Sequence, residues 1–218
     1  MNQIPCFDPY RLFFPLGTLA AILGMLPWIF FGVGALGFYP GPFHSDLMIG
    51  GFLFAFSAGF LMTAVPQFTG STHCNRQELF LSAALFTCLI VASVFDNRVW
   101  FHLISFSSLI YLVFFCVRRV LTRTYEPPPF FVFVGLGLSM GISGALLLTL
   151  GDIGLVESIT GLAIAKLLYT QGMTLSLILG VGTHLLPAIW GWSDLPVQIT
   201  KLHETPNQPQ NTISFNQF

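Results

Sequence analysis

The sequence predicts an all-α integral membrane protein, built as a bundle of six transmembrane helices. Hydrophobic residues make up 54% of its 218 residues and charged residues only 8%, against about 25% charged residues in an ordinary soluble domain. The charges also leave six long uncharged intervals, at 12–45, 47–75, 79–95, 99–117, 127–151 and 167–193. Because a helix needs about 20 mainly apolar residues to cross the hydrocarbon core, each interval can hold one crossing. The intervals lack the alternation that is typical of membrane strands.

The composition also excludes several classes of protein. Nine acidic and eight basic residues are too few to hydrate the surface of a soluble enzyme. A disordered regulator needs low hydrophobicity and high charge, and a nucleic-acid binder needs a basic face, whereas the net charge here is -1. We therefore expect membrane lipid, and no nucleic acid, to surround the chain. A cleaved signal peptide is disfavoured for the first interval, because Asp8 precedes it and no small-residue cleavage site follows before Asp46.

Residues 1–193 form one expected transmembrane domain, and turn-forming residues separate its six helices. The expected helices lie near 12–35, 45–66, 78–95, 99–118, 130–150 and 167–190. Gly and Pro residues at 37–42 end the first helix, and the short link 96–98 makes the third and fourth helices antiparallel neighbours. The three prolines at 127–129 form a stiff entry to the fifth helix. Three charges make 152–166 an expected interfacial or re-entrant piece, and 194–218 is an expected polar tail.

The basic residues predict the orientation, because positively charged short loops stay in the cytoplasm. With six crossings, one side of the membrane receives Arg11, Arg76, Arg118, Arg119, Arg123 and Lys201, and the other receives Arg98 and Lys166. We therefore expect both termini and the tail in the cytoplasm.

The four cysteines show no CxxC spacing, so a disulfide framework is not expected. His73 and Cys74 are either half of a metal site or part of a solvated loop.

Small residues in the helices have two interpretations. Residues 137–141 form a GxxxG pattern that Gly144 extends. In the last expected helix, Ser176, Gly180 and Gly182 have small side chains that leave space beside the backbone. Helices associate in lipid through close packing at such positions, so tight helix contacts are one interpretation. A slot for a flat cofactor is the other.

Few polar side chains fall within the membrane, so each one is a candidate functional residue. His44 and Asp46 stand where the second helix begins, and Met48 follows His44 by four residues, on the same helix face. Imidazole and thioether groups suit haem iron or copper, which makes His44 and Met48 candidate ligands and Asp46 a candidate metal residue. Alternatively, Asp46 only stabilises the positive end of the helix and Met48 only packs.

Two further histidines complete the candidate set. His102 lies one turn into the fourth helix, on the same side of the membrane as His44, so the two rings could hold haem iron between them. His184 lies near the other face, beside Gly182 and Pro187, where a separate metal could bind. Each ring could instead be an ordinary hydrogen-bonding residue.

The same region carries a family resemblance. Residues 43–71 read FHSDLMIGGFLFAFSAGFLMTAVPQFTGS, which resembles the NnrS pattern W-H-A-H-E-M, then G-F, then G-F-L-L-T-A-V-P-x-W-T-G. The opening DPYRLFF of residues 8–14 and the GTHLLP of residues 182–187 are similar to the family's F-R-x-F-F and G-G-R-x-I-P. The resemblance implies a bacterial inner-membrane protein that is linked to nitric oxide and nitrosative stress and binds haem and copper.

Three departures qualify the resemblance. The family's second histidine is Asp46 here, the acid after it is Leu47, and the arginine of the late motif is His184. Family members usually have about twice this length, so the chain resembles their first half. We therefore expect a homodimer, or a second membrane subunit, to cover the face that the other half would pack against.

Two classes of function remain. The first is an NnrS-like protein that binds haem or copper and handles nitric oxide or a related gas, with His44 and either His102 or Met48 as ligands. The alternative is a cofactor-free permease, a metal-trafficking protein or a structural subunit of a larger respiratory complex. No motif of conventional group-transfer catalysis is present, so redox chemistry at a bound metal is the only enzymatic option.

Overall fold

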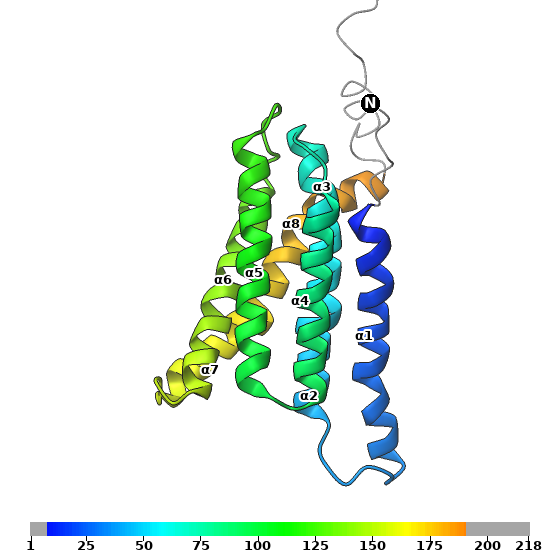
Figure 1. The fold of residues 1–218 in the computed structure, drawn as a ribbon, viewed down its shortest axis with the longest axis vertical. Helices are drawn as coiled ribbons and strands as arrows, with labels where there is room; N and C mark the ends of the chain where they lie inside the picture. Colours follow the sequence, from blue (N-terminus) through cyan, green and yellow to red (C-terminus); the bar gives the residue numbers. More distant parts are fainter. Residues whose placement is uncertain (1–7, 191–218) are drawn as a thin grey trace, which may run out of the picture.

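The computed structural model describes residues 8–190, and every regular element in that range is helical (Figure 1). Six helical segments in this range are long and apolar enough to cross a membrane. They run over Pro9–Gly32, Gly41–Thr69, Arg76–Val94, Arg98–Leu121, Phe131–Asp152 and Ile159–Thr183. The predicted all-α fold with six membrane-crossing helices is confirmed.

Two of the six crossings change helix type part-way along. Four crossings are single α-helices: α1 (Pro9–Gly32), α4 (Arg76–Val94), α5 (Arg98–Leu121) and α6 (Phe131–Asp152). The second crossing joins α2 (Gly41–Asp46), the π-helix η1 (Leu47–Leu53) and α3 (Phe54–Thr69). The sixth joins α7 (Ile159–Leu167), the π-helix η2 (Leu168–Gly172) and α8 (Met173–Ile189).

The sixth crossing begins earlier than the expected position near residue 167. Ser158 starts α7, because its hydroxyl accepts a hydrogen bond from the backbone N–H of Gly161 at 3.1 Å and so satisfies a free donor of the first turn. From there the chain stays helical through η2 into α8. Lys166 therefore lies inside a membrane-crossing helix rather than in a separate segment.

The turn between α4 and α5 has the tight geometry that the sequence predicts. Asp96 takes a left-handed conformation with φ of +50°, and the Asn97 side chain accepts a hydrogen bond from the N–H of Trp100 at 3.2 Å. α4 and α5 then pack as antiparallel neighbours (Figure 1). The turn lies at the same end of the bundle as α2 and α7 (Figure 1).

Small residues bring α6 against the sixth crossing. A Cβ atom at Gly144 would lie 2.6 Å from the backbone nitrogen of Tyr169 and 2.7 Å from the carbonyl oxygen of Ala165. One at Gly137 would lie 3.1 Å from the carbonyl oxygen of Met173. The interpretation of these glycines as close helix contacts is therefore confirmed.

An ion pair fixes α4 against α5 at the opposite end of the bundle. A guanidinium nitrogen of Arg119 lies 2.5 Å from a carboxylate oxygen of Glu78, and their side chains are only 4% and 13% exposed. The guanidinium also lies over the ring of Phe115, 3.8 Å from its centroid. Glu78 caps α4 as well, because it forms a reciprocal capping box with Asn75.

Some expectations fall on residues that the structure does not describe. The expected polar tail at 194–218, which contains Lys201, lies outside the described residues, as does Cys6, one of the four cysteines. His184 belongs to α8, but its side chain is also outside the described part of the structure.

Candidate functional site

Polar side chains gather at the end of the bundle where α2, the start of α5 and α7 meet. Two neighbouring cavities open there. The His44 cavity, of about 520 Å³, is lined by His44, Ser45, Met48, Ile49, Lys166, Thr170, Gln171, Thr174 and Leu175. The His102 cavity, of about 580 Å³, is lined by Tyr39, Gly41, Pro42, Ser45, Asp46, Arg98, His102, Leu148, Lys166, Tyr169 and Thr170. The two cavities share three residues and form one candidate site.

His102 is held by a carboxylate from another helix. Its Nδ1 atom lies 2.6 Å from a carboxylate oxygen of Asp152, the last residue of α6. Because an ionised carboxylate only accepts hydrogen bonds, Nδ1 carries the proton and Nε2 keeps its lone pair in the neutral ring. His102 is 9% exposed. The arrangement matches the carboxylate–histidine pair that orients metal-ligating imidazoles.

His44 is oriented in the same way by a backbone carbonyl. Its Nδ1 atom lies 3.1 Å from the carbonyl oxygen of Gly24 in α1. A carbonyl oxygen accepts only, so Nδ1 donates and Nε2 is again the nitrogen with a free lone pair. The ring of Trp28 meets the His44 ring edge-on, with 6.0 Å between centroids. These contacts give the ring a defined orientation beside the cavity that it lines.

Met48 lies on the same side of its helix as His44, and both residues line the His44 cavity. His44 and His102 lie at one end of the bundle, as expected from the sequence, but they line different cavities. Within residues 8–190, no group of three or more His, Cys, Asp or Glu side chains could hold a metal ion. The candidate donors are therefore the His44 imidazole and the Met48 thioether at one cavity and the His102 imidazole at the other.

Asp46 is engaged in an ion pair. Its carboxylate lies 3.0 Å from a guanidinium nitrogen of Arg98, and its side chain is 8% exposed. Arg98 also contacts the exposed Asp96 at 3.2 Å. A metal at Asp46 would compete with Arg98 for the carboxylate, so the structure favours a role for Asp46 in joining the second crossing to α5.

Both π-helices line the His44 cavity. η1 contributes Met48 and Ile49, and η2 contributes Thr170 and Gln171. π-helical turns are rare, and they occur frequently at functional sites because they reposition side chains by part of a turn. The backbone geometry of the two π-helices therefore indicates the same site as the positions of the histidines do.

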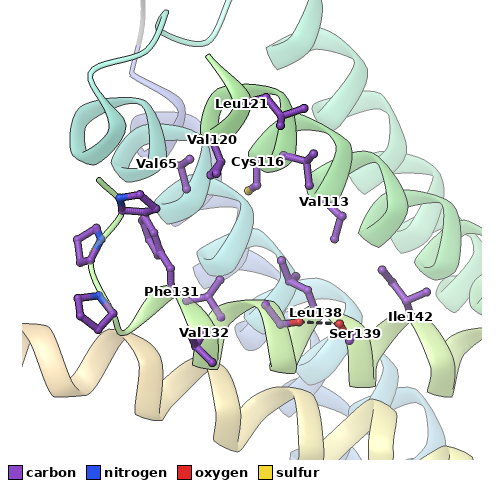
Figure 2. A pocket seen from close by; sticks show the side chains of 16 residues that line it. Val65, Val113, Cys116, Val120, Leu121, Phe131, Val132, Leu138, Ser139 and Ile142 are labelled. Atoms are coloured by element: carbon purple, nitrogen blue, oxygen red, sulfur yellow. Dashed lines mark hydrogen bonds between the residues drawn. The ribbon is translucent and has the colours of Figure 1, made fainter. Parts of the chain in front are cut away.

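Another cavity, of about 520 Å³, lies towards the opposite end of the bundle between α5 and α6 (Figure 2). Pro127, Pro128 and Pro129 form part of its wall, and its other lining residues are almost all aliphatic. The hydroxyl of Ser139 donates to the carbonyl oxygen of Gly135 at 2.8 Å, and Cys116 is the other polar side chain on the wall. This cavity carries no constellation for metal or acid–base chemistry.

A comparison with family models identifies the chain. The model described as "NnrS protein" matches residues 7–207, which include both cavities. The chain belongs to the NnrS family. Comparisons with curated proteins and with solved structures find no match. Family membership and the six apolar helices together indicate a multi-pass membrane protein.

Three residues at this candidate site are not among the residues that the sequence indicates as candidates. From the sequence, Asp152 and Lys166 are charges that make 152–166 an expected interfacial or re-entrant piece, and Tyr169 carries no prediction. Tyr169 is buried, and its hydroxyl donates to the hydroxyl of Ser105 at 3.1 Å. One sequence feature does indicate Asp152 as a possible partner of His102. Asp152 and Arg98 each lie at the end of an uncharged interval, on the same expected side of the membrane as His102.

Proposed function

We propose that this chain is an NnrS-like protein of the bacterial inner membrane that binds haem, copper or both and acts in the response to nitric oxide or nitrosative stress. One observation supports it above the others. His44 and His102, at one end of the bundle, each direct Nδ1 to a fixed acceptor and keep the Nε2 lone pair free. Imidazoles prepared in this way are typical metal ligands.

The donor set favours haem over a protein-bound copper ion. Haem iron takes one or two side-chain ligands, because the porphyrin supplies the other four. The described residues offer two oriented imidazoles and the thioether of Met48, and no group of three or more His, Cys, Asp or Glu side chains among them could hold a metal ion. His44 and His102 would hold haem, or His44 and Met48 would hold copper. Bound haem would supply an iron centre that can ligate a small gas such as nitric oxide.

The protein's own residues prepare the site. Asp152 and the Gly24 carbonyl fix the two rings, and the Asp46–Arg98 pair neutralises charge that would otherwise be costly at this depth.

We also propose both termini in the cytoplasm, which would place His44 and His102 on the outer side. Asp46 and His184 stay as candidate metal residues, although Arg98 already occupies the carboxylate of Asp46.

We also propose that a second copy of the chain, or another membrane subunit, packs against it. An apolar groove of about 490 Å³ runs between α1, α3 and α8, lined by side chains such as Phe14, Phe56 and Leu177. It gives a partner helix a place to pack. Single-molecule mass measurement in lipid nanodiscs tests this proposal. A mass of one chain alone at all concentrations contradicts it.

Absorption spectroscopy on the full chain, purified in detergent from cells supplied with iron and copper, tests the cofactor. We expect a Soret band that shifts on addition of nitric oxide or carbon monoxide. His44→Ala and His102→Ala should each reduce the band. His73→Ala is the matched control, because this exposed residue lies beyond α3, at the other end of the bundle. Loss of the band in His184→Ala alone would move the site to the other face.

A further inference from the structure

The candidate site contains a cation that forms no ion pair among the described residues. Lys166, in the last turn of α7, is the charged residue that lines both the His44 cavity and the His102 cavity. Among residues 8–190 no carboxylate forms a salt bridge with it. The carboxylate in the same lining, that of Asp46, is paired with Arg98. Lys166 is therefore the charged side chain in the lining of the two cavities that forms no ion pair among residues 8–190.

An ammonium group without an ion pair in a membrane-crossing helix is a candidate binding residue. Lys166 is exposed, so water solvates part of its charge. Lys166 lines both cavities, and each cavity is also lined by a histidine whose Nε2 lone pair is free. An anionic ligand in these cavities could accept a charge-assisted hydrogen bond from Lys166, which would give both orientation and affinity. Haem carries two carboxylates at one edge of an otherwise apolar ring.

We infer that Lys166 binds a carboxylate of the cofactor and so positions the ring between the His44 and His102 cavities. This inference rests on the proposed haem function. Lys166 is a positioning residue here, because it contacts the edge of the ligand and leaves iron ligation to the imidazoles. Thr170 follows Lys166 by one turn and lines both cavities too, but its hydroxyl already donates to the Lys166 carbonyl oxygen at 2.8 Å.

The test compares haem with its dimethyl ester, which has the same ring but lacks the carboxylate charges. The apo form of the full chain is reconstituted in nanodiscs of phosphatidylcholine alone, so that an anionic lipid headgroup cannot be the partner of Lys166. The affinity for each ligand is measured by absorbance titration. We expect the wild-type protein to prefer haem by about five-fold, as for a partly exposed ion pair.

Lys166→Gln should bind both ligands equally, and Lys166→Arg should restore the preference. Arg76→Gln is the matched control, because it removes an exposed positive charge at the opposite end of the bundle and should leave the preference unchanged. Equal binding of both ligands by the wild-type protein, or a full preference in Lys166→Gln, overturns the inference and leaves the haem function intact. Binding of neither ligand by the wild-type protein overturns both.

Discussion

The Nδ1 atom of His102 in α5 lies 2.6 Å from the carboxylate of Asp152 at the end of α6. This hydrogen bond fixes which ring nitrogen keeps its lone pair, and it joins two helices at the candidate site. Asp152→Asn keeps the shape of the side chain but allows the imidazole to take the other tautomer. We expect haem affinity to fall by about 10- to 100-fold, the usual effect of losing such a partner.

Absorbance titration measures that loss of affinity. Asp96→Asn is the matched control, because the Asp96 side chain is 81% exposed and its ion pair is with Arg98. An affinity for Asp152→Asn within two-fold of the wild-type value would show that this carboxylate does not orient a ligand.

The Asp46–Arg98 pair predicts a stability effect that does not depend on any cofactor. Arg98→Ala leaves a buried carboxylate without its partner, so we expect the free energy of unfolding to fall by about 1–3 kcal/mol. Adding Asp46→Asn should recover part of this loss, because the uncompensated charge is then gone. Unfolding by SDS in mixed micelles measures both variants. A double variant less stable than Arg98→Ala contradicts the account.

The close approach of α6 to the sixth crossing predicts a contrast between two glycines. Gly144→Ala forces backbone atoms apart, since its Cβ would lie 2.6 Å from a backbone nitrogen, and should destabilise by about 1–3 kcal/mol. Gly135→Ala, on the same helix, meets no atom within 4 Å. It should be neutral or stabilise by up to about 1 kcal/mol. Equal effects in the same unfolding assay would show that α6 does not pack closely there.

The Glu78–Arg119 pair at the other end predicts a larger loss. Glu78→Ala removes the hydrogen bond from the Asn75 backbone N–H, one half of the α4 capping box, and leaves the buried Arg119 guanidinium without its carboxylate. We expect a cost of about 3–5 kcal/mol in the free energy of unfolding. Glu126→Ala is the matched control, because that side chain is 88% exposed and should change stability by less than about 1 kcal/mol. Comparable losses in the two variants would contradict this role for Glu78.

The sequence was sufficient for the crossings, because the bilayer tolerates few charges and the uncharged intervals show where helices lie. It misplaced the start of the sixth crossing, since Asp152, Glu157 and Lys166 made 152–166 resemble an interfacial segment. In the structure Asp152 ends α6 beside His102, and Lys166 faces two polar cavities. Lys166 therefore stays within the helical sixth crossing, and 159–166 is not a separate segment.

The partners within the site could not be predicted in the same way. Asp46 and Arg98 are 52 residues apart, and His102 and Asp152 are 50 apart. Their pairing depends on which helices are neighbours, and hydropathy does not specify that. The π-helices at Met48 and Thr170 also have no sequence signature that we recognised. Histidine position could be predicted, whereas the groups that orient each ring required the structure.

The most direct test of the proposed function is the iron content and absorption spectrum of the purified full chain, compared with its His44→Ala, His102→Ala double variant. We predict that the wild-type protein contains haem iron with a Soret band that nitric oxide shifts, and that the double variant is colourless but still folded. A colourless wild-type protein from iron- and copper-supplied cells, or a double variant with the full band, would contradict the account.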